Sequence, residues 1–231
     1  MVLGDLRQDL LDEAKADLVQ KGFLSEKIST TQMNLTDLAT VKTTFDDAEK
    51  AFGKVDILVN IAGVIIGYYK LDDMREEDWD LTFNVNVKGL MEMSREFVKR
   101  LKARNAGGSI VNVASNAAKV CFADMADYNA SKAAVMNLTQ SMALEWAPYG
   151  INVNAVCPGA VDTAMLRKCM EESIRLYGGD MEEMRKTWGP PQLGRLIQPY
   201  EVGRVIRFLA SEDAVIIRGQ AISVDAGNTR F

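Results

Sequence analysis

Short apolar runs alternate with longer amphipathic runs along most of this chain, and this alternation restricts the possible folds more than any other feature. Four runs rich in β-branched residues have the length of strands, at residues 55–60, 109–115, 151–158 and 221–225. Runs with apolar residues at three- and four-residue spacing, typical of helices, accompany them at residues 35–53, 85–104, 127–150 and 200–211. Strand and helix in turn predict an α/β fold, in which helices cover both faces of a parallel sheet.

Length and composition indicate a single globular domain over residues 1–231. The 231 residues are 48% hydrophobic and 26% charged, which provides enough apolar material for a sizeable core. With 27 Lys and Arg against 32 Asp and Glu, the net charge is −5, and neither sign is gathered into a long block. Nucleic acid is therefore not expected as a partner.

The sequence also favours a protein of the cytoplasm without a membrane anchor or a metal. No apolar run reaches the ~20 residues that span a bilayer, and the first residues lack a basic leader followed by an apolar stretch. Cys121, Cys157 and Cys169 form no CxxC pair, and the chain has no histidine, so a structural zinc site would lack ligands. We expect three reduced thiols, no metal site and no contact with membranes.

One long segment, residues 162–199, has no regular pattern. It carries several methionines, Tyr177 and Trp188, many charges and a Gly-Pro-Pro break. We expect a mobile lid over a site, although a surface excursion that packs on a neighbouring subunit is a second interpretation.

Small residues follow three of the predicted strands, at the end where ligands bind in open α/β sheets. The first strand leads into Ala62 and Gly63, the second ends at Ser115, and the third leads into Pro158 and Gly159. Small side chains and a Pro-Gly turn let a flat ligand approach the backbone closely. Ordinary strand-to-helix turns are the alternative interpretation of each position taken alone.

Proton transfer in this chain has to be done without histidine, and Tyr128 and Lys132 are the candidates. They lie four residues apart in a helical pattern, so both side chains project from one face. A nearby ammonium favours the phenolate and makes tyrosine a usable acid or base. Such a pair is common on solvated helices, but Ser115, thirteen residues earlier, adds a hydroxyl that could bond the same substrate oxygen.

The chain resembles the classical short-chain dehydrogenase/reductase family from Asp5 to Gly227, because several family motifs occur in the right order and at the right spacing. The matching residues are Asn60-Ile61-Ala62-Gly63, Asn86, Ser115, Tyr128 with Lys132, and Pro158-Gly159-Ala160-Val161-Asp162-Thr163. Ile61 stands where the family has a second asparagine, and Ala226 where a glycine is usual. The resemblance implies a Rossmann-like, doubly wound parallel sheet.

The resemblance also implies a reaction, in which hydride passes between a nicotinamide ring and a secondary alcohol or ketone. Tyr128 would exchange a proton with the substrate oxygen, while Lys132 would lower the pKa of this tyrosine and hold the nicotinamide ribose. Ser115 would orient and polarise the substrate oxygen. Asn86 would support a water chain that delivers protons to Lys132.

Further residues would contact the cofactor if the resemblance holds. Val161 and Thr163 would fix the carboxamide of the ring, and the turns at Asn60, Ala62 and Gly63 and at Pro158 and Gly159 would offer backbone contacts. Each assignment has a structural alternative: Asn86 could bond its own helix, Thr163 could cap the next helix, and Val161 could belong to the core.

One departure from the family is serious. The family opens with a strand and a Gly-rich turn that holds the pyrophosphate, and no such stretch occurs in this sequence. Residues 2–5 fit the end of the family's second strand instead, so we expect the sequence to lack roughly 30 residues at its N-terminus, including the central strand. A true short form would need another chain, or a rearranged sheet, to fill the gap.

Two functional hypotheses follow. The first is an NAD(P)-dependent oxidoreductase, favoured because Asn86, Ser115, Tyr128 and Lys132 occur together. The second is a catalytically silent relative that acts as a binding or scaffold subunit, favoured by the missing phosphate loop.

Asp5 decides the expected cofactor. A carboxylate at the end of the second strand of the family can bond a ribose diol and would repel a 2′-phosphate, so NAD is expected over NADP. Arg7 is the opposing signal, because it could reach a phosphate. Asn34 and Leu35 resemble the residues that flank the adenine in the family, with asparagine in place of the usual aspartate.

Substrate and assembly are less constrained. A polyol, sugar or hydroxy acid would follow the habit of the family, and no residue identifies one of them. The helical runs 85–104 and 127–148 carry apolar stripes with Val87, Leu90, Met91 and Val98 on one and Ala134, Leu138, Met142 and Trp146 on the other. In proteins that this chain resembles, these helices pair with their symmetry mates and the last strand adds a second interface, so a homotetramer or homodimer is expected.

Overall fold

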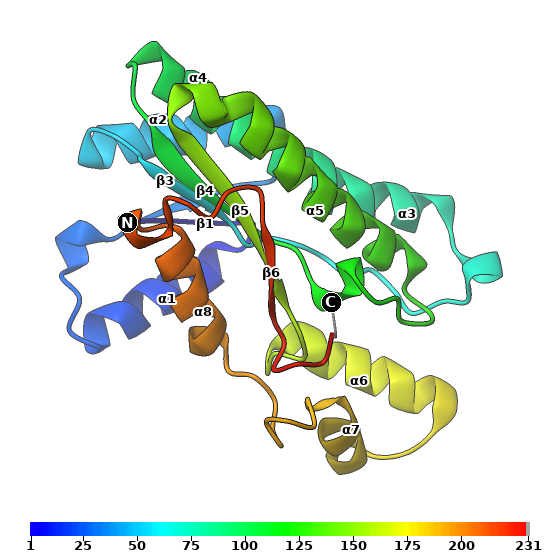
Figure 1. Cartoon of the computed structure of the whole chain (residues 1–231). Coiled ribbons are helices and arrows are strands. Elements are labelled where there is room, and N and C mark those ends of the chain that lie inside the picture. The colour runs from blue at the N-terminus through cyan, green and yellow to red at the C-terminus, as the bar shows by residue number, and fades with distance from the viewer. Residues whose placement is uncertain (230–231) are drawn as a thin grey trace.

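Helices and strands alternate along the chain in the computed structural model, which describes residues 1–229 (Figure 1). The strands are β1 (Val2–Asp5), β2 (Ser29–Gln32), β3 (Ile57–Asn60), β4 (Gly108–Val113), β5 (Ile151–Pro158) and β6 (Ala221–Val224). The helices are α1 (Gln8–Gln20), α2 (Leu38–Phe52), α3 (Glu76–Phe83), α4 (Leu90–Ala103), α5 (Ala126–Trp146), α6 (Ala164–Tyr177), α7 (Met181–Trp188) and α8 (Pro199–Leu209). A π-helical turn, Asn84–Gly89, joins α3 to α4.

Every strand pair is parallel, as the alternation predicted, but the sheet is in two parts. β1 pairs with β2, and β3, β4, β5 and β6 pair in that order. Within residues 1–229, no ladder joins β1 to β3. Ile57, at the start of β3, is half exposed.

Helices cover both faces of the sheet and enclose two apolar cores. Figure 1 shows α4 and α5 on one side and α1 and α8 on the other. Successive residues of a strand point to opposite faces: Ile110 packs in the core under α4 and α5, and Val111 packs in the core under α8. Both side chains are fully buried, because helices cover both faces of β4.

The apolar stripes on α4 and α5 are less exposed than the sequence suggested. Leu90, Val98 and Met142 are buried in the core of their own chain, and Leu138 and Trp146 pack against it. One sheet face therefore covers much of the surface that we expected to find free for a partner.

The segment for which we predict a lid, residues 162–199, is largely helical rather than irregular. It contains α6 and α7, joined through Gly178 and Gly179, both of which have positive φ. Its two ends are tied together, because Val161 forms a parallel bridge with Ile197 and the Asp162 amide donates to the Ile197 carbonyl at 2.8 Å. In Figure 1, α6 and α7 lie beyond one end of the strands.

Candidate active site

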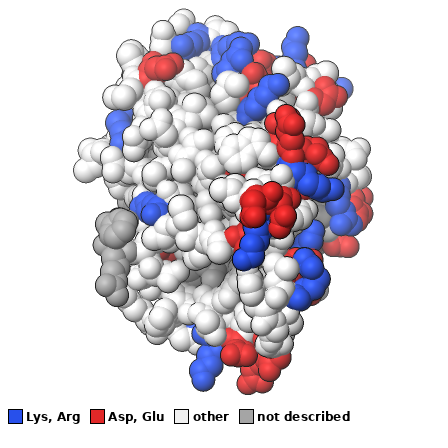
Figure 2. All heavy atoms as spheres, turned by 90° about the vertical axis from the view of Figure 1, so that its right-hand side faces the viewer, with Lys and Arg blue, Asp and Glu red and all other residues white. Residues whose placement is uncertain are grey.

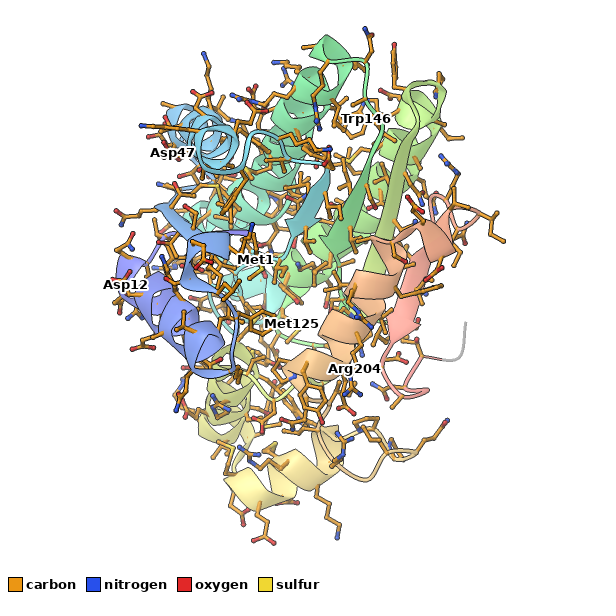
Figure 3. All side chains as sticks on the ribbon, turned by 90° about the vertical axis from the view of Figure 1, so that its left-hand side faces the viewer. Met1, Asp12, Asp47, Met125, Trp146 and Arg204 are labelled. Atoms are coloured by element: carbon orange, nitrogen blue, oxygen red, sulfur yellow. The ribbon has the colours of Figure 1, made fainter. Side chains whose placement is uncertain are left out.

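A pocket of about 840 Å³ lies beyond the carboxyl ends of β4 and β5, between the sheet and the lid. Ser115, Tyr128 and Lys132 line it together with Gly63 and Gly159, so the structure brings these predicted residues into one place. Figure 3 shows Met125, which precedes α5, between the strand ends and the lid helices.

Tyr128 and Ser115 form the polar centre of the pocket. Ser115 follows β4 and caps the short turn Asn116–Ala118, because its Oγ accepts a hydrogen bond from the Ala117 amide at 3.1 Å. Burial raises the pKa of Tyr128 to about 12, although a hydrogen bond with Ser115 acts in the opposite direction. Tyr128 is therefore a neutral proton donor near pH 7.

Lys132 is buried in the same pocket as Tyr128. Only 4% of its surface is exposed, and Nζ donates to the Val113 carbonyl at 2.9 Å. Burial lowers the pKa of Lys132 to about 8. Nζ lies 5.6 Å from the centre of the Tyr128 ring, yet the pKa of Tyr128 lies above its ordinary value. Burial is the largest cause of this upward shift. That Lys132 lowers the pKa of Tyr128 during the reaction stays a prediction.

Asn86 lies in the π-helical turn, where the widened helix directs its side chain toward the loop after β3. Its Oδ1 accepts from the Val64 amide at 2.8 Å, and its Nδ2 donates to the Val64 carbonyl and to Ser131 Oγ, both at 3.0 Å. Asn86 thus does not bond its own helix, which was the alternative from sequence. It fixes the loop that carries Gly63 against α5.

Glycine is needed at position 63 because of this arrangement. A Cβ at Gly63 would lie 3.2 Å from Lys132 Nζ and 3.3 Å from Asn86 Oδ1. The atoms close to this glycine are side-chain atoms of the same chain, and the predicted approach of a flat ligand to this turn stays a prediction.

In the turn after β5, Thr163 and Val161 make the capping and core contacts that we gave as alternatives to cofactor contacts. Gly159 lies against Asp225, where a Cβ would come within 2.8 Å of the Asp225 Cβ. Thr163 caps α6, with Oγ1 accepting from the Leu166 amide at 3.2 Å, and Val161 packs against the core under α8. Both side chains, together with Pro158, still line the pocket.

The predicted cofactor residues on the other side of the sheet do not line this pocket. Asp5 is exposed at the end of β1 and accepts from the Arg7 amide at 2.9 Å, while the Arg7 guanidinium is paired with Asp9. Asn34 bonds to Thr36 through its side chain.

The remaining three residues of this group serve packing or are exposed. Asn60 is buried and donates to Ser94 at 3.1 Å and to Asn112 at 2.8 Å, so its side chain belongs to the core. Leu35 packs against the core under α4, and Ala62 is exposed.

Three pocket residues were not found from the sequence: Tyr68, Met125 and Cys169. They form a small buried cluster against which Tyr128 and Trp188 pack. They come from the loop after β3, from the residue before α5 and from α6, and nothing in their local sequence signals that these segments meet.

The pocket fits a nicotinamide group. Its volume of about 840 Å³ at the strand ends could hold the ring, and Lys132, Ser115 and Tyr128 line it with polar atoms. Within residues 1–229 no helix is long and apolar enough to cross a membrane. The same residues contain no group of three or more His, Cys, Asp or Glu side chains that could hold a metal ion.

Comparisons with known proteins identify the family of the chain. A family model described as enoyl-(acyl carrier protein) reductase matches residues 1–229. An NAD-dependent glycerol dehydrogenase of Listeria innocua is 34% identical over 99% of this chain and 84% of its own length. A 3-oxoacyl-[acyl-carrier-protein] reductase of Thermotoga maritima is 36% identical over 98% of this chain and 86% of its own length.

Solved structures of oxidoreductases are also similar to this chain. A variant of the actinorhodin polyketide ketoreductase, solved with NADPH, superposes with a TM-score of 0.93 at 27% identity, over 100% of this chain and 87% of that one. Sorbitol-6-phosphate 2-dehydrogenase from Erwinia amylovora superposes with a TM-score of 0.91 at 28% identity, over 100% and 90%.

The fold and the site thus define a Rossmann-like α/β oxidoreductase. The chain belongs to the short-chain dehydrogenase/reductase family, whose members are NAD(P)-dependent oxidoreductases acting on CH–OH groups.

Proposed function

We propose that this chain transfers hydride between NAD and a secondary alcohol or ketone, with Tyr128 as the acid-base group. The observation that carries the proposal is the meeting of Ser115, Tyr128 and Lys132 in one buried pocket beside Gly63. A scaffold subunit has no need for two ionisable side chains in a pocket, because burying them costs free energy.

Each side chain has a separate part in the proposed reaction. In ketone reduction the Tyr128 hydroxyl donates its proton to the substrate oxygen while Ser115 donates a hydrogen bond to the same atom. In alcohol oxidation Tyr128 takes this proton back. Lys132 holds the ribose next to the ring, Val161 and Thr163 hold the carboxamide, and Asn86 keeps the Gly63 loop in place. The nicotinamide, when bound, supplies the hydride acceptor or donor.

The proposal of NAD over NADP rests on Asp5. Its carboxylate at the end of β1 would bond the adenine ribose and repel a 2′-phosphate, with Asn34 and Leu35 beside the adenine. Support comes from Arg7, whose guanidinium pairs with Asp9 instead of standing free for a phosphate. The relatives use both cofactors: the glycerol dehydrogenase is named as NAD-dependent, and the ketoreductase was solved with NADPH.

Titration of the purified chain with NADH, followed by nicotinamide fluorescence, tests the function directly. We expect saturable binding below about 1 mM, the usual range for such sites, and Asp5→Ala should shift the ratio of kcat/KM values toward NADPH. No binding at millimolar cofactor would favour the scaffold hypothesis, and equal or higher efficiency with NADPH in the unmodified protein would reject the NAD assignment.

We further propose a homotetramer or homodimer that works in the cytoplasm, with residues 162–199 as a lid over a small-molecule substrate. The outer face of α5 supports the assembly. Asp127 and Lys132, the charged residues of α5 before Glu145, are both buried, so the exposed face is uncharged over most of its length. Figure 2 shows part of the molecular surface with few charged side chains, next to a part where they are crowded. Such a face is suited to an interface.

A further inference from the structure

An apolar wall stands on the lid side of Tyr128. Tyr68, Met125 and Cys169 form its buried part, and Trp188 at the end of α7 packs against them. The Tyr128 ring packs on the same cluster. Any group attached to the reacting carbon on this side of Tyr128 therefore meets aromatic rings, a thioether and a thiol.

This wall is uncharged near neutral pH. Burial raises the pKa of Cys169 to about 11, and burial also raises the pKa of Tyr68 above its ordinary value. Neither side chain carries a negative charge near pH 7.

Among residues 1–229, Lys132 is the one cation on the pocket lining, and the proposed reaction already assigns it to the nicotinamide ribose. Among residues 1–229 the charged side chains that line the pocket are Asp124 and Lys132, and no arginine does so. Lys132 is bound to the Val113 carbonyl, and Asp124 accepts a hydrogen bond from Tyr177. A phosphate or carboxylate on the substrate would lose its hydration with no partner to replace it, and this is costly.

We propose, on the basis of the oxidoreductase function above, that the substrate is a neutral ketone or secondary alcohol carrying an apolar group that lies against Tyr68, Met125, Cys169 and Trp188. A polyol would place hydroxyls against this wall, where few groups can bond them, while burial of an aliphatic or aromatic ring is favourable by about 25 cal/mol per Å². On this proposal a polyol, sugar or hydroxy acid, the substrates that the resemblance suggested, would bind less tightly than a ketone with an apolar group.

Calorimetry with the full chain separates these substrate classes without requiring turnover. The ligands are 4-phenylbutan-2-one, the same ketone with a carboxylate at the para position of the ring, and sorbitol. We expect the neutral ketone to bind at least about tenfold more tightly than either of the other two ligands. Sorbitol has no phenyl ring to transfer from water, and the carboxylate would lose its hydration without a partner. Equal or tighter binding of the carboxylate or of sorbitol would overturn the proposal.

Two tryptophan variants localise the ligand. Trp188→Ala should raise the KM for reduction of 4-phenylbutan-2-one by about tenfold, and that for acetone much less, because acetone is too small to reach the wall. Trp79→Ala is the matched control: this residue is on α3, stacks on Phe83 and does not line the pocket. Equal effects of Trp188→Ala on both ketones would contradict the proposed position of the apolar group.

The same experiments distinguish this inference from the proposed function. Tight binding of the neutral ketone without turnover, with either NADH or NADPH, would support the ligand class of the pocket and reject the oxidoreductase function. Turnover with highest kcat/KM for a polyol or an anionic substrate would support the function and reject the inference.

Discussion

Tyr128 and Lys132 are two ionisable residues in one pocket whose pKa values are shifted in opposite directions, upward to about 12 and downward to about 8. Burial causes both shifts, because it disfavours the charged form of each side chain. In the folded protein, each side chain therefore favours its neutral form more than it does in water.

Removal of the Tyr128 hydroxyl is the sharpest test of the proposed chemistry. Tyr128→Phe should reduce turnover to background and leave the unfolding midpoint nearly unchanged, since it removes only one oxygen from the pocket. Steady-state rates with NADH and a ketone measure the first effect, and circular dichroism melting measures the second. Tyr149→Phe, at an exposed tyrosine outside the pocket, is the control and should keep full activity. Near-normal turnover in Tyr128→Phe would refute the mechanism.

Ser115→Ala tests the second hydroxyl. Loss of a positioned donor to the substrate oxygen should lower kcat by about 10²–10³-fold, with little change in NADH affinity. The Ala117 amide would also lose its partner, so a melting curve is needed beside the kinetics. A loss of NADH affinity as large as the loss of kcat would argue against this role.

The lowered pKa of Lys132 predicts a dependence of stability on pH. Between pH 8 and the ordinary lysine value near 10.4, the unfolded chain binds this proton and the folded chain does not, so the contribution of Lys132 to the free energy of unfolding rises with pH. Tyr128 loses its proton near pH 10 in the unfolded chain, but it does so in wild type and in the variant, so its effect cancels from their difference. Urea unfolding at pH 8 and pH 10 should therefore show that the difference between wild type and Lys132→Met grows in favour of wild type, by up to about 1.4 kcal/mol per pH unit. A constant difference would mean that the ammonium is not desolvated.

At the scale of elements, the lid depends on a two-glycine link between α6 and α7. Gly178 has φ 78° and ψ −172°, a conformation that is open to glycine and strained for other residues. The tied ends of the lid, at Val161 and Ile197, leave this link as its most adaptable point.

A pair of glycine variants tests the link. Gly178→Ala should lower the free energy of unfolding by about 1–3 kcal/mol through backbone strain. Gly203→Ala, at a helical glycine of α8 with no atom near its added methyl group, should instead raise it by about 0.5–1 kcal/mol. Urea denaturation of both variants gives the comparison, and a Gly178→Ala protein as stable as wild type would show that the link adopts another conformation in solution.

The sequence predicted elements well where apolar periodicity is strong, and poorly elsewhere. The run 151–158 became β5 with the same bounds, because every residue before Pro158 is buried. β2 was missed because its four residues, Ser-Thr-Thr-Gln, are polar, and α7 was missed because charges dominate its short span.

The candidate site shows the same division. Ser115, Tyr128 and Lys132 could be grouped from spacing, since a strand end and a helix face determine where they lie. The direction of the pKa shift of Tyr128 could not be predicted from the sequence, because it depends on burial in the folded chain. Met125 and Cys169 meet only through tertiary packing.

At the scale of the whole molecule, the uncharged face of α5 predicts self-association. Leu144, which is 79% exposed on this helix, would be buried in the proposed interface. Leu144→Arg should lower the mass measured by light scattering at micromolar concentration, because a charge in an apolar interface is costly. Leu71→Arg, at a residue that is 68% exposed outside α4 and α5, should leave the mass unchanged. A wild-type monomer would refute the assembly.

The division of the sheet into two ladders predicts that the protein opens locally in two separate units. β1 and β2 are bonded to each other, and their packing is with α1 and α2, while β3 to β6 form a separate ladder. Cooperative opening follows such units, because breaking one ladder leaves the other intact. Amide protons of Leu3 and Thr31 should then exchange with solvent through a sub-global opening, at a lower free energy than those of Ile110 and Val156. The ribose-binding end proposed for Asp5 would belong to the half of the protein that opens first.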